Sequence, residues 1–174
     1  MKKTFLLFLF SLAVIASQAQ SIFFPKTWIG QWKGTLQVAT NNGSVNNVGM
    51  QLILENSKKP NQYYFTIVYS NGGKEDVRSY TLIADTLNPG HYFMDEGNGI
   101  KINEYLFGTT LISQFVVEGQ ILTALYSFER EQIRFRIISA NATPAGTTGG
   151  KGDIPIVQDF EIMAYQEAIL TKVK

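Results

Sequence analysis

The stretch Trp28–Gly34, which reads WIGQWKG, opens a patterned run that decides the fold. From Trp32 onward the residues alternate, with Trp32, Gly34, Leu36 and Val38 on one side and polar residues on the other. A period of two residues is typical of a β-strand with one buried face. The stretch therefore predicts a first strand that places Trp32 in the core.

The rest of the chain predicts further short strands joined by tight turns. Turn sequences such as Asn41-Asn42-Gly43 and Gly97-Asn98-Gly99 separate the patterned runs. The predicted strands span residues 32–40, 48–56, 63–69, 77–85, 91–96, 100–107, 109–117, 121–129, 133–140 and 154–171. Hairpins between neighbours predict an all-β fold, an antiparallel up-and-down β-barrel of about 8–10 strands. A two-sheet sandwich is the alternative.

Two segments carry separate expectations. Residues 141–153 are rich in Gly, Thr, Ala and Pro and lack periodicity, so we expect a long mobile loop there. This is the one connection long enough for the crossing that a sandwich needs. A short helix over residues 166–172 is possible at the end of the chain.

The Gly30-Gln31-Trp32 opening resembles that of lipocalin-like (calycin) barrels. The resemblance implies that Gly30 and Trp32 form a structural motif, in which the tryptophan seals the closed end. It also implies that an arginine on a late strand packs over this ring, and Arg134 and Arg136 are the candidates.

The fatty-acid-binding type of barrel is similar in strand number, with two departures. That type has a helix pair between its first two strands, whereas this chain has only residues 41–47 there. It also carries an Arg-x-Tyr in the last strand, whereas Arg78-Ser79-Tyr80 lies in the fourth predicted strand here. The resemblance therefore carries over no ligand site.

Residues 1–19 have the features of a cleavable secretory signal peptide. A Lys2-Lys3 start precedes an apolar run from Phe5 to Ile15 and small residues up to Ala19. We expect cleavage there, which leaves residues 20–174 as a single domain and makes the protein secreted or periplasmic. The chain has no cysteine, so the domain relies on its core and carries no lipid-accepting thiol.

Charge and hydropathy narrow the possible partners. Without Lys2 and Lys3, the 15 basic residues fall to 13 against 14 acidic ones, a net charge of −1. No basic excess is available to bind phosphate backbones, so we expect no nucleic acid partner. No second apolar run approaches the roughly 20 residues of a membrane span, so we expect none.

The sequence gives little support to catalysis. His91 is the one histidine and would have to be the base of any triad. One histidine without cysteine cannot complete a tetrahedral zinc site. Residues 95–99, with Asn103 and Glu104 beyond, offer oxygen ligands for calcium, but a hairpin turn explains them better. We predict no enzyme activity, no metal and no cofactor.

The candidate ligand site lies on strand faces that could point inward. Arg78 and Tyr80 are two residues apart, so their side chains share a face with Leu82. A buried guanidinium needs a partner. Glu75, Asp76, Glu104 or Glu161 could serve, or a ligand's carboxylate. The full set of predicted ligand-binding residues is Arg78, Tyr80, Tyr64, Phe115, Tyr126 and Arg136. For Arg134 and Arg136, an outward position in water is the favoured alternative.

Three functions remain open from the sequence. The preferred one is a secreted protein that binds a small hydrophobic or carboxylate-bearing ligand in its barrel. A structural or protein-interaction module, with its barrel filled by its own side chains, is the alternative. An enzyme of calycin type is the third and weakest. A cavity of about 300 Å³ or more with an open mouth would favour binding over the filled module.

Overall fold

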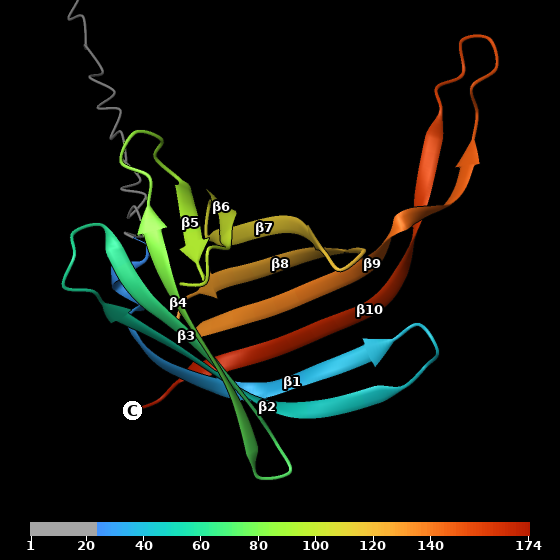
Figure 1. The fold of residues 1–174 in the computed structure, drawn as a ribbon. Coiled ribbons are helices and arrows are strands. Elements are labelled where there is room, and N and C mark those ends of the chain that lie inside the picture. Colours follow the sequence, from blue (N-terminus) through green and yellow to red (C-terminus); the bar gives the residue numbers. More distant parts are fainter. Residues whose placement is uncertain (1–23) are drawn as a thin grey trace, which may run out of the picture.

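The computed structural model describes residues 24–174, and the signal peptide predicted over residues 1–19 lies outside this part of the chain. After the 3-10 turn η1 (Lys26–Trp28), the chain forms ten strands (Figure 1). They are β1 (Gly30–Thr40), β2 (Val45–Asn56), β3 (Gln62–Asn71), β4 (Lys74–Ala84), β5 (His91–Asp95), β6 (Lys101–Phe107), β7 (Thr110–Val117), β8 (Gln120–Glu129), β9 (Gln132–Thr148) and β10 (Val157–Lys172).

The strands form one closed sheet. Each pairs antiparallel with its neighbours in the chain, and β1 also pairs with β10, so the order around the barrel is β1-β10-β9-β8-β7-β6-β5-β4-β3-β2. The predicted up-and-down barrel is confirmed, and the sandwich alternative is wrong. Within the described residues, no helix is long and apolar enough to cross a membrane.

Alternation along the strands gives the barrel its core. In β2, for example, Met50, Leu52 and Leu54 are buried while the residues between them are less so. Successive side chains of a strand point to opposite faces, so one apolar set from every strand meets inside. The largest fully buried side chains are Trp32, Phe65, Phe128, Phe135, Leu52, Leu54, Leu82, Leu111, Ile133 and Leu170.

Trp32 closes one end of the barrel, as predicted. It is 2% exposed, and its indole N–H donates to the Trp28 carbonyl oxygen at 3.0 Å. Trp28 in η1 packs on Trp32 and on Phe128, with ring centroids 5.3 and 4.9 Å apart. Phe24 lies against Phe128 as well, at 4.7 Å. The segment before β1 thus acts as a lid of aromatic rings.

The cation over Trp32 is not an arginine. Lys172, at the end of β10, places its Nζ 5.3 Å from the ring centroid. The expectation for Arg134 or Arg136 is wrong, because both alternate with the buried Ile133 and Phe135 and so lie on the outer face of β9.

Two glycines of the opening stretch have backbone reasons to be there. Gly30 has a φ of +139°, which side-chain-bearing residues rarely adopt. At Gly34, a Cβ would lie 2.2 Å from the Ile169 carbonyl oxygen of β10. The close approach of β1 to β10 therefore depends on the missing side chain.

Residues 141–153 do not form the expected loop. β9 and β10 continue past the barrel and pair with each other as far as Thr148 and Val157, so they make a projecting hairpin (Figure 1). We call residues 142–163 the arm. The register shifts between Asp159 and Ala164 mark where it bends from the barrel. The possible helix over residues 166–172 is also wrong, because these residues belong to β10.

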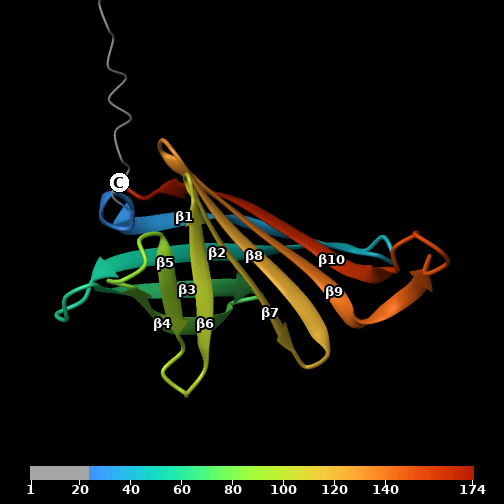
Figure 2. The same ribbon diagram turned by 90° about the horizontal axis from the view of Figure 1, so that it is seen from above.

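The barrel wall is incomplete between β4 and β7. β4 pairs with β5 only from Thr81 to Ala84, so residues 74–80 have no partner strand on that side. β6 pairs with β7 only from Tyr105 to Phe107, and Figure 2 shows β7 and β8 diverging from β6. An opening toward the interior results on this side.

Candidate functional site

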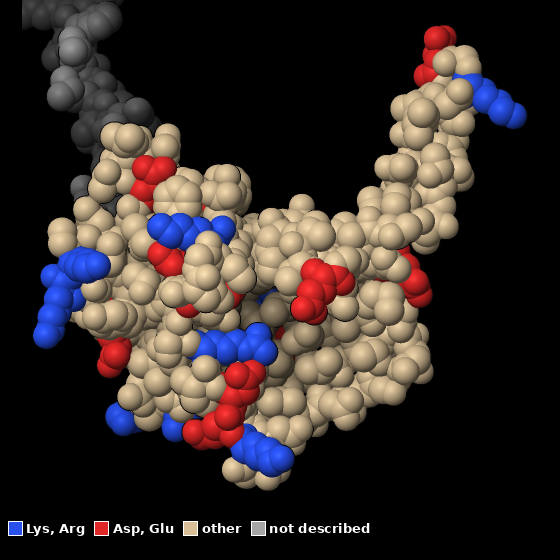
Figure 3. All heavy atoms as spheres, in the orientation of Figure 1, with Lys and Arg blue, Asp and Glu red and all other residues tan. Residues whose placement is uncertain are grey.

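An open cavity lies where the wall is incomplete. Its volume is about 600 Å³, and it is bounded by the inner faces of β1 to β4 and β8 to β10. Figure 3 shows a hollow near the centre of this face, with charged side chains of both signs around it. The lining residues are Leu36, Val38, Val48, Tyr69, Asn71, Lys74, Glu75, Asp76, Arg78, Leu122, Ile137 and Gln166. The cavity therefore combines an apolar wall with a polar mouth.

Arg78 stands at this mouth and is paired within the protein. Its Nε and Nη2 donate to Asp76 Oδ2 at 3.0 and 2.9 Å, and its side chain is 50% exposed. The guanidinium also lies over the ring of Tyr69, 5.1 Å from the centroid. The expected inward face of Arg78 and Tyr80 is present. The guanidinium is not deeply buried, because the free edge of β4 leaves it in contact with water. It also has a partner, Asp76.

Tyrosines lead from the mouth into the barrel. Burial raises the pKa of Tyr69 to about 12, against the opposing effect of Arg78. Burial raises the pKa of Tyr80 too, and the adjacent Arg78 lowers it in part. Tyr126 is 5% exposed, and burial raises the pKa of its phenol well above the usual value, with smaller effects from Tyr69 and Glu104. Tyr126 is therefore near both Tyr69 and Glu104 on the inner side of the barrel.

From the sequence, Glu104 is considered only as a turn-flanking residue or a partner of Arg78, and it is absent from the predicted ligand-binding set. It is 3% exposed on the inner face of β6, and its Oε2 has no hydrogen-bond partner among the described residues. Burial raises the pKa of its carboxyl to about 7, and a hydrogen bond with Ser113 opposes this. The sequence held a signal, because Glu104 occurs in phase with Ile102 and Leu106 on a strand with one apolar face.

Three other predicted site residues occupy different places. Tyr64 is 45% exposed on the outer face of β3, so it cannot line the interior. Arg136 also lies on the outer face, where its Nη2 donates to Ser127 Oγ at 3.1 Å. Phe115 is half-buried on the inner face of β7 and pairs with the cavity-lining Leu122. The structure thus brings Arg78, Tyr80, Tyr126 and Phe115 toward one interior, and excludes Tyr64 and Arg136.

The outward position of Arg134 follows the favoured alternative, with a different partner. It pairs with Glu167 of β10, whose other carboxylate oxygen accepts from the Tyr165 hydroxyl at 3.1 Å. The nearby Glu129 and Glu131 are not in this pair. The contact ties β9 to β10 on the outside of the barrel.

A second hollow, of about 1480 Å³, lies at the closed end. Residues 129–132 and 171–174 form much of its lining, so loop and terminal side chains surround it. The buried Trp32 and Phe128 also line it. The open-side cavity is the better candidate site, because its wall is the inner face of the barrel.

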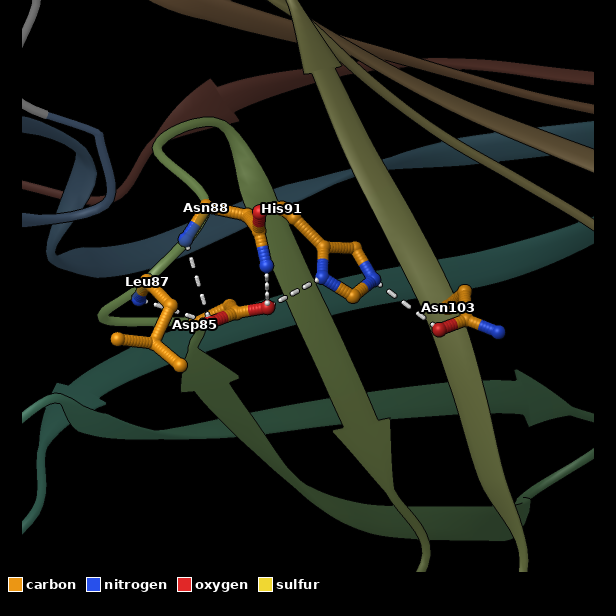
Figure 4. Close-up of polar contacts among 5 residues, drawn as sticks. All are labelled: Asp85, Leu87, Asn88, His91 and Asn103. Atoms are coloured by element: carbon orange, nitrogen blue, oxygen red, sulfur yellow. Dashed lines mark hydrogen bonds and ion pairs between the residues drawn. The ribbon is translucent and has the colours of Figure 1, made fainter.

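His91 belongs to a network that braces the loop between β4 and β5 (Figure 4). Asp85 accepts from the Leu87 backbone N–H at 2.9 Å, from Asn88 Nδ2 at 2.8 Å and from His91 Nδ1 at 2.8 Å. His91 Nε2 lies 3.0 Å from Asn103 Oδ1. These contacts raise the pKa of His91 and lower that of Asp85. Both ring nitrogens of His91 are thus engaged by Asp85 and Asn103, which fixes the ring against the loop.

The oxygen-rich residues 95–99 form a turn between β5 and β6. Asp95 Oδ1 accepts from the Gly97 N–H at 2.9 Å, and Asn98 Oδ1 accepts from the Ile100 N–H at 2.9 Å. Lys101 lies 3.4 Å from the other Asp95 oxygen. These side chains serve the turn, in agreement with the hairpin interpretation.

Comparison with known proteins adds evidence on the fold. No protein-family model and no curated protein matches the chain. A protein of unknown function from the DUF3598 family of Nostoc punctiforme has a TM-score of 0.60 and 9% identity, covering 83% of this chain and 47% of that one. The S-type phycobiliprotein lyase CpeS of Guillardia theta has a TM-score of 0.60 and 6% identity, covering 84% and 88%.

The likeness shows the fold alone. This chain is a β-barrel structurally like these two proteins. The chain spans about half the length of the Nostoc protein. At such low identity, no site residue is carried over from either structure.

Proposed function

We propose that this protein binds a small amphipathic molecule in the open cavity of its barrel and that it does so outside the cytoplasm. One observation carries the proposal: a cavity of about 600 Å³ whose walls are apolar and whose mouth is polar. Small-molecule sites fall in the range of roughly 300–1,000 Å³ and combine apolar walls with a few polar groups. The predicted signal peptide over residues 1–19 supports export.

The lining sets the orientation of the ligand. Val48, Leu122 and Ile137 would contact its apolar part, because they form the wall of the cavity. Any polar group at its outer end would face Arg78 and Asp76, where water reaches both side chains. The apolar contacts would provide most of the affinity, because the charged groups at the mouth already satisfy one another.

Binding is preferred over catalysis on the chemistry of the described residues. Hydrolysis by a triad needs a base beside a nucleophile. His91 lies on the outer face of β5, with both ring nitrogens already engaged by Asp85 and Asn103. The polar groups around the cavity offer recognition, and we propose no reaction for them.

A dye titration tests this proposal. Nile red, a neutral apolar dye without N–H groups, should bind the purified protein at one site with enhanced fluorescence. Val48→Trp fills the cavity wall and should weaken binding by about tenfold or more, which corresponds to about 1.4 kcal/mol. Asn47→Trp places the same ring on the outer face of β2 and is the matched control. Absence of saturable binding, or equal binding by both variants, would refute the proposal.

A second candidate function is a protein-interaction module that holds no ligand. The arm favours it, because its large apolar side chains face water: Ile154, Ile156, Val157, Phe160, Ile162 and Met163 are 36–70% exposed. Exposed apolar strands are common sites of contact with other proteins. A protein that fails to bind the dye, yet loses association with other chains when the arm is shortened, would support this alternative.

A further inference from the structure

Glu104 is an acidic residue at a position where an apolar side chain would be more favourable for the free energy of folding. Ile102 and Leu106 share its face of β6, and its carboxyl is buried beside Ser113 and Tyr126. A buried polar atom without a hydrogen bond costs about 1–3 kcal/mol. Among the described residues, Oε2 of Glu104 is such an atom. The position is costly for folding and leaves one oxygen free to accept a hydrogen bond.

Glu104 does not line the cavity, and two small side chains, Ala124 and Ser113, lie between it and the cavity wall on the inner face. Ile137 lines the cavity and pairs across the sheet with Ala124 of β8. Ala124 in turn pairs with Ser113 of β7, and Ser113 hydrogen-bonds to Glu104. Neighbouring strands are about 4.8 Å apart, so three steps separate Ile137 from Glu104 by roughly 14 Å. An elongated molecule that enters at the mouth would follow this line along the inner face.

The charges at the mouth and around Glu104 indicate which chemical group of a ligand would bind at Glu104. The mouth residues Lys74, Glu75, Asp76 and Arg78 carry two positive and two negative charges, so they favour neither sign. Among residues 24–174, burial raises the pKa of the Glu104 carboxyl, Ser113 lowers it, and no basic side chain contributes. A cation or an N–H donor would satisfy the free oxygen, whereas a second carboxylate would be repelled.

We propose that Glu104 is the inner anchor of the ligand and binds a hydrogen-bond-donating nitrogen, best supplied as the protonated amine of an amphipathic molecule. The inference rests on the proposed function and makes it more specific. It also replaces the carboxylate ligand expected from Arg78, because Asp76 already pairs that guanidinium. Arg78 then shapes the mouth, and Glu104 selects the ligand.

Displacement of bound Nile red by three matched amphiphiles tests the anchor. Decylamine, decanol and decanoate share a chain and differ in the head group. At pH 8, the wild-type protein should release the dye at a decylamine concentration about tenfold below that of decanol, because a hydrogen bond between two charged groups is stronger than one to a neutral hydroxyl. Decanoate should be the weakest of the three. In Glu104→Gln, the advantage of decylamine over decanol should disappear while decanol is unaffected.

The pH dependence of the wild-type protein provides a second test that needs no variant. Tyr92 and Tyr126 are the titratable neighbours on β5 and β8, and burial raises the pKa of both, so they stay neutral below pH 8. The advantage of decylamine should therefore shrink between pH 8 and pH 5, as Glu104 takes up a proton.

The outcomes separate the two proposals. Equal displacement by decylamine and decanol, or a decylamine advantage that survives both Glu104→Gln and pH 5, would overturn the anchor and leave the binding function standing. A wild-type protein that binds no dye at all would overturn the binding function and the anchor together.

Discussion

His91 shows how a single residue ties pH to stability in this protein. Its Nδ1 faces Asp85 Oδ2 at 2.8 Å and its Nε2 faces Asn103 Oδ1 at 3.0 Å. Both oxygens are acceptors, so the contacts are satisfied together when the imidazole is protonated. The ring also stacks on Tyr105, with centroids 4.9 Å apart, and this packing does not depend on its charge.

We predict that His91→Phe destabilises the protein more at pH 5.5 than at pH 9. The folded-state pKa of His91 is raised by Asp85, so its charged contacts stabilise the fold fully below the unfolded value of about 6.5. This stability is lost as the pH rises through the folded-state pKa. Phenylalanine keeps the aromatic packing, and the pH-dependent loss should be below about 1 kcal/mol. Urea unfolding at both pH values measures it, and an equal loss at both would contradict a charged His91.

Arg78 and Glu104 show what strand phase can and cannot predict about single residues. Alternation places both on inner faces, and this holds in the structure. Their burial differs because β5 is short and covers β4 only from Thr81, which leaves Arg78 in contact with water. Glu104 lies beside Tyr92 of β5 and Ser113 of β7, and is covered. The lengths of the neighbouring strands determine this difference in burial. No residue pattern within β4 or β6 encodes the lengths of their neighbours.

At the scale of elements, the arm is a hairpin built outside the barrel. β9 pairs with β8 as far as Asn141, and β10 pairs with β1 as far as Ala164. Beyond these residues the two strands pair with each other, and backbone hydrogen bonds of Ala142 with Gly119 and of Met163 with Asn41 join the base of the arm to the barrel. An isolated two-stranded hairpin is marginally stable in water. The arm therefore contributes little to the stability of the barrel.

We predict that the barrel tolerates removal of the arm. Replacing residues 142–160 with an Asn-Gly turn should shift the thermal midpoint by less than about 4 °C, which is about 1 kcal/mol for a domain of this size. Nile red binding should be unchanged, since the cavity has no lining residue in this segment. Circular dichroism during heating measures the midpoint. A variant that is unfolded at room temperature would show that the arm supports the barrel.

The arm escaped prediction for a physical reason. The β10 half of the arm is exposed on both faces, so it needs no alternation of apolar and polar residues. Gly146, Gly149 and Gly150 and the following Pro155 resemble a loop in composition. The pairing of Asp159 with Gly146 and of Phe160 with Pro144 holds the segment extended instead. Backbone pairing between two such stretches leaves little trace in hydropathy.

The whole molecule is a barrel with one sealed end and one incomplete wall. The sealed end is what the resemblance of Gly30-Gln31-Trp32 to calycin openings implies, and the strand phase of Trp32 with Leu36 and Val38 predicts that its ring is buried. The incomplete wall could not be predicted from the sequence, because it follows from the divergence of β6 and β7 and the shortness of β5. The core is therefore closed off at the Trp32 end of the sheet, and the cavity is reached through the gap between β4 and β7.

The central claim is that this interior holds one small amphipathic molecule. Native mass spectrometry tests it most directly, on the folded protein after incubation with decylamine, decanol and decanoate and removal of excess ligand. The account predicts a complex with one ligand per chain, richest in decylamine, that is depleted in Val48→Trp and retained in Asn47→Trp. A spectrum that contains only the ligand-free mass for the folded wild-type protein would contradict the claim.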